Sequence, residues 1–471
     1  MRVTLATAGL FLGPAVFAGL LLMPQPEGMA PEAQRLAAVA AWMAAWWISE
    51  AVPIPATALL PVLLYPLLGI MPAGQVTGSY AHHLIYLFMG GFMIAVTMER
   101  WNLHRRIALQ VIQRVGTAPA RLVLGFMLAT ALLSMWISNT ATAMMMVTIG
   151  IAVLKQLLPD GRHQTEPLGT ALMLGIAYAA SIGGVATLIG TPPNAILAGV
   201  LSQNYGVELR FAEWMRFALP LSVIMLLLTW VYLTRIAFRV TSTVLPEASG
   251  HIRAQLRALG PMSAPERRVA WVFGSVALLW MGRGFIDWAP LQAVNDSTIA
   301  IAGALALFVI PADWQQRVFL LDWDTAVRIP WDIIILFGGG FALAAGFSDT
   351  GLSGWLADQL QVLEDVPRIW VILAVGLLVI FLTEVTSNTA TASVMLPVLG
   401  ALSEALQLPP MILMVTATLC ASFAFMLPVA TPPNAIVFSS RCVRIPHMAR
   451  AGFWLNITGV LLITAFVYLW Y

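Results

Sequence analysis

Long runs of apolar residues recur along the whole chain, and polar positions are mostly confined to the short stretches between them. Runs of roughly 18 or more apolar residues are typical of helices that cross a bilayer, whereas the strands of a membrane β-barrel alternate between apolar and polar residues. The pattern therefore predicts an all-α polytopic membrane protein. We expect apolar segments at residues 5–23, 36–48, 54–71, 83–98, 119–137, 139–157, 168–199, 217–238, 269–282, 297–311, 331–348, 369–386, 388–403, 411–439 and 452–470.

The triplet Ser-Asn-Thr occurs twice, at residues 138–140 and 387–389, and each copy lies in the middle of an apolar stretch. A loop of three residues cannot carry the chain out to water and back. Each pair of flanking segments is therefore expected to form a re-entrant hairpin, over residues 119–157 and 369–403. Irregular backbone is tolerated at membrane depth only where it is buried in protein or lines a cavity. We therefore expect the two tips to meet at a central site.

A second motif, Thr-Pro-Pro-Asn, also occurs twice, at residues 191–194 and 431–434. Two consecutive prolines cannot continue a helix, and they free the carbonyl groups of the preceding turn. The apolar segments that contain the motif, 168–199 and 411–439, are therefore predicted to be broken helices. The asparagine of each motif is expected to cap the half-helix that resumes after the prolines.

The distribution of basic residues predicts the orientation of the chain in the membrane. If the N-terminus is cytoplasmic and each hairpin returns to its own side, 19 of the 24 Lys and Arg residues lie inside. This bias is what the positive-inside rule requires. The arrangement has eleven spans and two hairpins, with the first hairpin entering from the cytoplasm, the second from outside, and the C-terminus outside. The first apolar segment is interpreted as a helix rather than a signal peptide.

The chain also repeats itself. "YLFMGGF" at residues 86–92 resembles "ILFGGGF" at 335–341, and Phe88 lies 249 positions before Phe337, the same separation as between the two triplets. The two Thr-Pro-Pro-Asn motifs are 240 positions apart. An odd number of spans between the copies puts the two halves in opposite orientations. Landmarks repeated in one order, in oppositely oriented halves, indicate an inverted-repeat secondary transporter.

The polar groups at the tips and breaks can bind both an anion and a small cation. Asparagine amides and Ser and Thr hydroxyls donate and accept hydrogen bonds, and the helix after each tip presents free N–H groups to an anion. The carbonyls of Gly190 and Ala430, just before the prolines, are hard oxygen ligands for a cation such as Na⁺. Ser134 and Thr383 lie one turn before the tips, on the same helix face, and can complete a cation shell.

Charged residues elsewhere in the apolar segments have more than one interpretation. Glu384 is the one acidic residue in the core of the second hairpin, and its counterpart in the first hairpin is Met135. Intramembrane acids are functional by default, but a structural role and a coupling role both stay open. Glu50 and Asp332 are expected to be interfacial. The run "WNLHRR" at residues 101–106 favours a cytoplasmic interfacial helix with snorkelling arginines over an anion funnel.

Composition narrows the function classes. The chain of 471 residues is 60% hydrophobic and only 10% charged, with a mean hydropathy of +0.86 and a net charge of +2. Two cysteines favour neither a structural disulfide nor a metal cluster. The chain has no H-E-x-x-H or G-x-S-x-G motif, so we expect neither an enzyme nor an organic cofactor. No nucleic-acid partner is expected, and an anion channel is the alternative from a different class.

The chain resembles the divalent anion/sodium symporter family, whose members carry dicarboxylates, citrate or sulfate. The resemblance covers nearly the full length. It rests on the paired Ser-Asn-Thr and Thr-Pro-Pro-Asn motifs, supported by "GGGF", by "WNLHRRIAL" and by "ASFAFMLPVATPPNAIV" at residues 421–437. It implies a homodimer in which each protomer has a scaffold domain and a mobile transport domain that moves as an elevator.

The resemblance also implies boundaries and site residues. The expected parts are a scaffold part of the first repeat (1–116), a transport part of the first repeat (117–240), a cytoplasmic linker (241–268), a scaffold part of the second repeat (269–365) and a transport part of the second repeat (366–471). The first Na⁺ site would use Ser134, Ser138, Asn139 and Gly190. The second would use Thr383, Ser387, Asn388 and Ala430. The substrate would meet Asn139, Thr140, Thr191, Asn388, Thr389 and Pro432.

The implied function is transport of a C4-dicarboxylate such as succinate, malate or fumarate, coupled to Na⁺ as the co-transported ion. A sodium-independent dicarboxylate exchanger of the same fold, or a sulfate or citrate transporter, stays open. At position 191 many bacterial relatives have serine, and the extra methyl group of Thr191 narrows the pocket. Short loops favour a prokaryotic inner membrane, with the lipid bilayer and a second copy of the chain as partners.

Overall fold

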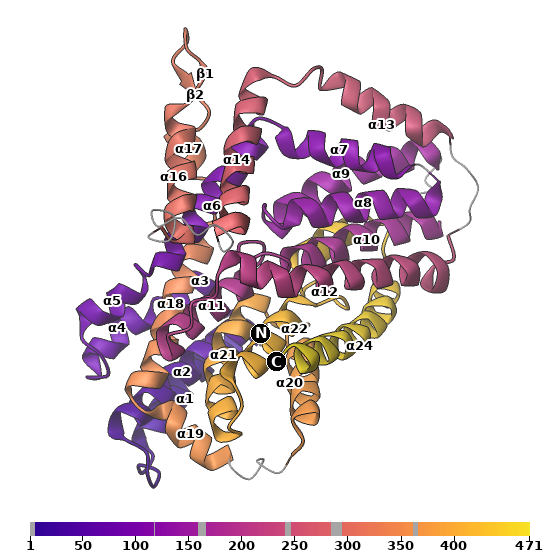
Figure 1. Cartoon of the computed structure of the whole chain (residues 1–471). Helices are drawn as coiled ribbons and strands as arrows, with labels where there is room; N and C mark the ends of the chain where they lie inside the picture. Colours follow the sequence, from indigo (N-terminus) through magenta and orange to yellow (C-terminus); the bar gives the residue numbers. More distant parts are fainter. Residues whose placement is uncertain (1–4, 117, 159–165, 241–245, 284–293, 361–365) are drawn as a thin grey trace.

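A computed structural model describes residues 5–116, 118–158, 166–240, 246–283, 294–360 and 366–471, and these residues are almost entirely helical (Figure 1). By length and composition, six helices of the described chain can cross a bilayer, and six shorter apolar helices of 10–17 residues accompany them. The all-α fold is as predicted, and the number of eleven crossings stays a prediction. Residues 159–165, 361–365 and the first part of the predicted linker, 241–245, lie outside the described residues.

The helices of the first half follow the predicted segments closely. They are α1 (Leu5–Leu22), α2 (Pro31–Ser49), α3 (Ile54–Thr57), α4 (Leu60–Leu67), α5 (Ala73–Ser79), α6 (His83–Arg100), α7 (Leu103–Val115), α8 (Pro119–Ser134), α9 (Asn139–Leu157), α10 (Pro167–Gly184), α11 (Pro192–Tyr205) and α12 (Phe211–Val231), which continues as a π-helix over Tyr232–Ala237. The segment expected as one span over 54–71 is instead divided between α3 and α4.

The second half has a similar order of elements. They are α13 (Pro246–Ala258), α14 (Ala264–Gly282), α16 (Asp296–Val309), the antiparallel pair β1 (Pro311–Asp313) and β2 (Val318–Phe319), α17 (Trp323–Ala326), α18 (Trp331–Asp349), α19 (Leu352–Leu360), α20 (Arg368–Leu382), α21 (Asn388–Ala405), α22 (Pro410–Ser422), α23 (Pro432–Ser439) and α24 (Ile445–Trp470). The short strands were not predicted.

Each Ser-Asn-Thr triplet lies at the junction between two consecutive helices, and we keep the name hairpin for each pair. In the first, α8 begins at a proline in the first turn, and Ser138 caps α9 by accepting a hydrogen bond from the Ala141 N–H at 3.2 Å. A serine in this position satisfies a free N–H of the first turn. The second hairpin consists of α20 and α21. That each hairpin enters and leaves at one membrane face stays a prediction.

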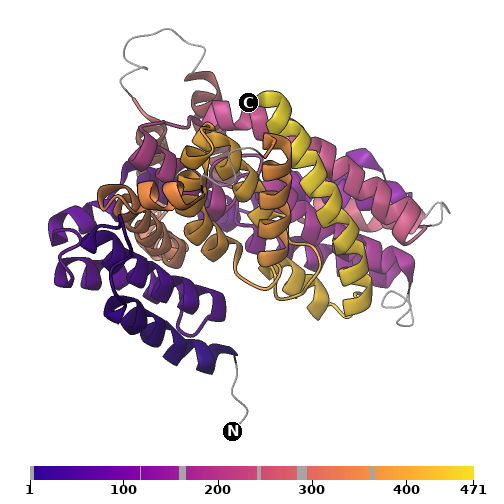
Figure 2. The ribbon, with the colours of Figure 1, turned by 90° about the horizontal axis from the view of Figure 1, so that it is seen from below.

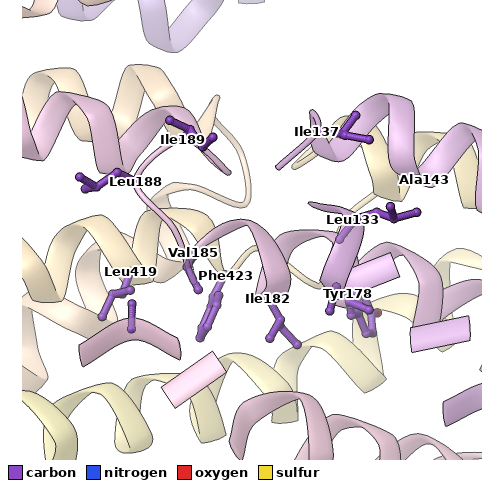
Figure 3. Packing of buried hydrophobic residues seen from close by; sticks show 14 of the residues in the cluster. Leu133, Ile137, Ala143, Tyr178, Ile182, Val185, Leu188, Ile189, Leu419 and Phe423 are labelled. Carbon is purple, nitrogen blue, oxygen red and sulfur yellow. The ribbon is translucent and has the colours of Figure 1, made fainter. Parts of the chain in front are cut away.

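The two halves of the chain interlock around the hairpins. Helix α23 of the second half packs on α9 and α10 of the first, and α11 of the first half packs on α21 and α22 of the second. Figure 1 shows α7, α8, α9, α10 and α12 in layers, and Figure 2 shows α1 and α2 at one flank with α24 at the opposite flank. One large apolar cluster therefore joins hairpin residues such as Leu133 with break residues such as Leu188 and Phe423 (Figure 3).

Glycines of the two repeated stretches allow close helix approach. A Cβ atom on Gly90 would lie 2.6 Å from the carbonyl carbon of Ala300, so α6 and α16 touch through their backbones. A Cβ atom on Gly339 would lie 2.5 Å from the carbonyl oxygen of Ala58. Small residues at such crossings are typical of helix packing in membranes.

Helix α7 is held in place by a buried ion pair. Arg106 donates from Nε to Glu266 Oε1 at 2.5 Å, from Nη2 to Oε2 at 3.1 Å, and from Nη1 to the Gly260 carbonyl at 3.0 Å. Glu266 also belongs to the capping box of α14, where it accepts from the Ser263 N–H at 3.2 Å. The sequence predicted that the arginines of this run snorkel to the interface. Arg106 instead is buried and joins α7 to the start of α14.

This ion pair gives the first testable prediction. Arg106→Ala leaves Glu266 buried without its partner, and breaking a buried pair from one side costs about 3–5 kcal/mol. We expect a clearly lower melting temperature of the purified protein in detergent. Arg105→Ala, on the neighbouring and more exposed residue, is the control. Equal melting temperatures for the two variants would contradict the assignment.

Candidate functional site

Both Ser-Asn-Thr tips and both Thr-Pro-Pro-Asn breaks line a single cavity of about 460 Å³. The tips contribute residues 138–140 and 387–389, and the breaks contribute 189–192 and 428–433. All six residues predicted to contact a substrate lie in its wall: Asn139, Thr140, Thr191, Asn388, Thr389 and Pro432. Four of the predicted cation ligands besides the asparagines lie there as well: Ser138, Gly190, Ser387 and Ala430. The two tips therefore meet at one cavity, as expected.

The cavity receives four helix N-termini. Asn139, Pro192, Asn388 and Pro432 are the first residues of α9, α11, α21 and α23, and all four lie in its wall. The first turn of a helix carries free N–H groups and the positive end of the helix dipole. Four such ends direct positive dipole ends toward one cavity, which has no Lys or Arg side chain among its described lining residues.

Behind the first tip, the side chain of Asn139 is held by the first broken helix. In the amide orientation that satisfies its neighbours, its nitrogen donates to the carbonyls of Ala180 and Gly190, each at 3.2 Å, and contacts Ser134 Oγ. Ser134 is fully buried and donates to the Ala180 carbonyl at 2.8 Å. Ser134 thus lies behind the cavity wall, one layer deeper than the other predicted ligands.

At the second tip, Thr383 takes the place of Ser134. Thr383 Oγ1 lies 2.7 Å from Asn388 Oδ1 and 2.9 Å from the carbonyl oxygen of Ala421. Thr383 is fully buried and, like Ser134, does not line the cavity. The first hairpin is therefore joined to the broken helix of its own half through Ser134 and Asn139, and the second through Thr383.

The asparagines of the Thr-Pro-Pro-Asn motifs do not cap the half-helices, so that expectation is wrong. Asn194 Nδ2 donates to the carbonyl of Thr187 at 2.7 Å, and Asn434 Nδ2 donates to those of Leu427 at 3.0 Å and Ala424 at 3.1 Å. Both side chains reach back to backbone carbonyls of the break that precedes the prolines. The cap of α23 is Thr431, whose hydroxyl accepts from the Asn434 N–H at 3.2 Å.

The first break has room only for glycines. A Cβ atom on Gly190 would lie 2.4 Å from the Gly184 carbonyl oxygen, and one on Gly184 would lie 2.7 Å from Asn139 Oδ1 and 3.0 Å from the Gly190 carbonyl oxygen. The corresponding residues of the second break are Ala424 and Ala430. The carbonyl of Gly190 and the amide of Asn139 are therefore in close contact in the first half, in a geometry that the second half does not share.

The opposite wall of the cavity is mostly apolar and comes from α3, α6 and α18. Phe88 and Phe337, which hold matching positions in the repeat, meet there edge to face with ring centroids 4.8 Å apart. The same side carries Glu50 and Asp332, which sequence reasoning placed at the membrane interface. No local pattern indicates that these two carboxylates border the cavity, because they reach it only through packing of distant segments.

Glu384 does not line the cavity. It is buried behind the second break, where its carboxylate accepts hydrogen bonds from the backbone of Phe425, Met426 and Leu427 and from the side chain of Asn456. Within the described residues, no three or more His, Cys, Asp or Glu side chains cluster as a metal site. A cation in the cavity would therefore be held by carbonyl, amide and hydroxyl oxygens, which suit Na⁺ better than a transition metal.

Comparisons with known proteins agree with this geometry. The model of the sodium:sulfate symporter transmembrane region matches residues 5–471. Proteins named sodium-dependent dicarboxylate transporter SdcS, from Staphylococcus saprophyticus and Staphylococcus aureus, are each 44% identical over 468 residues, covering 98% of this chain and 90% of theirs. These relatives are transporters and not enzymes.

Two solved structures share the fold. The YdaH transporter of Alcanivorax borkumensis, noted for an unusual topology, is 14% identical with a TM-score of 0.56, covering 99% of this chain and 96% of its own. MtrF of Neisseria gonorrhoeae, described as illuminating a class of antimetabolite efflux pumps, is 12% identical with a TM-score of 0.60, covering 97% and 94%. At these identities the likeness supports the all-helical membrane-transporter fold alone.

The close contact at the first break gives the second prediction. Gly184→Ala places a methyl group against Asn139 and the Gly190 carbonyl, and overpacking of this kind costs about 1–3 kcal/mol. We expect the purified protein to melt at a lower temperature. The matched control in the second break is Ala424→Gly, which removes a methyl group and costs about 0.5–1 kcal/mol. A Gly184→Ala variant no less stable than the control would show that the first break is not tightly packed.

Proposed function

Because the chain belongs to the sodium:sulfate symporter family, we propose that it is a secondary transporter that carries a dicarboxylate together with Na⁺. The observation that carries this proposal is the cavity itself. It gathers four helix N-termini and two Ser-Asn-Thr tips, and no cationic side chain is among its described lining residues. The N–H groups and hydroxyls suit the carboxylates of a dianion, and the carbonyls of Gly190 and Ala430 suit Na⁺.

The absence of Lys and Arg from the described lining supports coupling between the two ligands. At the tips and breaks, a dianion would meet hydroxyls, amides and helix dipoles, which compensate less charge than a guanidinium would, and the carboxylates of Glu50 and Asp332 on the facing side supply no positive charge. Bound Na⁺ supplies the missing positive charge, and by linkage the anion strengthens Na⁺ binding by the same factor. The roles follow the matching motifs, with Ser134, Ser138, Asn139 and Gly190 around one ion, and Thr383, Ser387, Asn388 and Ala430 around the other.

A C4-dicarboxylate such as succinate is the substrate we favour. The relatives at 44% identity carry the name of dicarboxylate transporters, whereas the family model is named for sulfate. A cavity of about 460 Å³ with one tip from each half can offer hydrogen-bond donors to both ends of a short dianion. The second candidate is a sodium-independent exchanger, which would use the same donors without the cation shells.

The polarity of the two cavity walls supports an elevator motion. The polar lining side chains of 138–140, 191, 387–389 and 431 come from the hairpins and broken helices, and the facing wall of α3, α6 and α18 is mostly apolar. A transport part made of the hairpins and broken helices would carry the whole site along this smooth wall. Glu50 and Asp332, cytoplasmic by the distribution of basic residues, border the cavity, so we assign the structure to the inward-facing state. A homodimer in a prokaryotic inner membrane completes the proposal.

The decisive experiment is uptake of labelled succinate by proteoliposomes that contain the purified protein. We expect uptake with an inward NaCl gradient and none above empty liposomes with choline chloride. The exchanger is tested in the same assay by loading the liposomes with unlabelled succinate. Uptake that needs internal succinate and ignores Na⁺ would replace symport by exchange, and an unsaturable current would indicate a channel.

Substitutions at the two tips test the site. Asn139→Ala and Asn388→Ala each remove a side chain that lies in the cavity wall and that contacts a buried hydroxyl behind it. We expect the rate of uptake to fall at least about tenfold, because the free energy of a hydrogen bond to a charged group corresponds to a factor of that size. The matched control is Asn102→Gly at the exposed start of α7, where φ of 58° suits glycine. Wild-type uptake by either tip variant, with normal folding in detergent, would contradict the assigned site.

A further inference from the structure

The two broken helices satisfy their backbone differently. In the first, α10 remains helical to Gly184, and the N–H of Ala186 then bonds to the Gly183 carbonyl at 3.0 Å in a local turn. In the second, α22 ends at Ser422, and residues 423–427 form neither a helix nor a hydrogen-bonded turn. Buried N–H groups that lie outside a helix or turn need partners from elsewhere in the fold.

Glu384 supplies those partners. Its Oε1 accepts from the N–H of Phe425 at 2.7 Å and of Met426 at 2.9 Å, and its Oε2 accepts from the N–H of Leu427 at 3.1 Å. Asn456 of α24 donates from Nδ2 to Oε1 at 2.7 Å. All four groups that contact the carboxylate are hydrogen-bond donors, and such an environment suits an ionised carboxylate. With 3% of its surface exposed, Glu384 is shielded from water.

The first half has no equivalent of this arrangement. Met135 holds the position that corresponds to Glu384, and a thioether is at best a weak acceptor. There, the Met135 carbonyl instead accepts a hydrogen bond from the Thr187 hydroxyl. The first break is thus held by neutral groups that donate to carbonyls, and the second by a carboxylate that accepts from N–H groups.

A chain of contacts connects Glu384 to the cavity. Leu427, whose N–H bonds to Glu384, accepts at its carbonyl from the Ala430 N–H at 3.2 Å and from Asn434 Nδ2 at 3.0 Å. Ala430 lies in the cavity wall. On the other side, the residue before Glu384 is Thr383, which contacts Asn388 and the Ala421 carbonyl. Glu384 therefore binds the break directly and is adjacent in sequence to Thr383, which contacts the tip.

We propose that Glu384 is a positioning residue for the second cation site, where it sets the place of the Ala430 carbonyl and adds a buried negative charge nearby. The inference rests on the proposed Na⁺ coupling and deepens it. It makes the two cation sites unequal, because only the second has an acidic residue behind it. Loss of Glu384 acts on the Na⁺ dependence of transport more than on the dicarboxylate.

The test compares Glu384→Gln with wild type in proteoliposomes. Glutamine keeps the shape, but its NH₂ group would face backbone N–H donors. We expect the Na⁺ concentration for half-maximal succinate uptake to rise by about tenfold or more, since several hydrogen bonds to a charged group are weakened. At saturating Na⁺, the KM for succinate is expected to stay within about twofold of wild type.

A second measurement needs no transport. The melting temperature of the detergent-purified protein is recorded against NaCl, with choline chloride at the same ionic strength as reference, because an ion that binds only the folded state raises it. We expect the Glu384→Gln variant to need about tenfold more NaCl than wild type for the same rise. Should Glu384→Gln fail to fold, Asn456→Ala removes one of the four donors and is expected to shift the Na⁺ dependence the same way by a smaller factor.

Met135→Leu, at the matching position of the first hairpin, is the control and should leave the Na⁺ dependence unchanged. A Na⁺ response of Glu384→Gln or Asn456→Ala equal to wild type would overturn the inference while leaving the proposed function intact. An equal shift in Met135→Leu would also overturn it. A wild-type protein that responds to Na⁺ in neither measurement would overturn the proposed function, and the inference with it.

Discussion

The structure depends on one constraint: a helix that is interrupted at membrane depth must still satisfy the backbone groups it frees. The chain meets this constraint with side chains near each interruption. Ser138 and Thr431 cap helices, Asn194 and Asn434 bind carbonyls of the breaks, and Glu384 binds N–H groups. What remains free at the four helix starts faces one cavity. The proposed binding site thus includes backbone N–H and C=O groups that have no hydrogen-bond partner within a helix.

A site built from dipoles differs from one built from charged side chains in how it can be coupled. An arginine would hold a dianion in the absence of any ion, and transport would then lose its dependence on Na⁺. Dipoles and hydroxyls stabilise a dianion incompletely in a water-poor cavity, where each uncompensated charge is costly. On the proposed function, the ion gradient can drive uptake because neither ligand is bound well alone.

The sequence predicted those features that leave a local signal, and missed those that depend on distant packing. Polar triplets and double prolines inside apolar runs located both hairpins and both breaks, with the first hairpin expected over 119–157 and found over Pro119–Leu157. The capping role of Asn194 failed, because its partner is a carbonyl of the preceding loop whose path no motif specifies. The division of α3 from α4 was missed for the same reason, since the Ala58 carbonyl there accepts from Tyr80, 22 residues away.

The two halves show that a repeated motif does not guarantee repeated chemistry. The triplets and the proline motifs are identical in the two copies, yet glycines pack the first break and alanines the second. Because α22 ends at Ser422, earlier than its counterpart α10, the second break has residues outside any helix or turn, and the N–H groups of Phe425, Met426 and Leu427 bond to Glu384 from the neighbouring hairpin. A buried carboxylate is a strong hydrogen-bond acceptor for these N–H groups, and it also places a negative charge beside the second break. An asymmetry required by backbone geometry therefore also makes the electrostatics of the two proposed ion sites unequal.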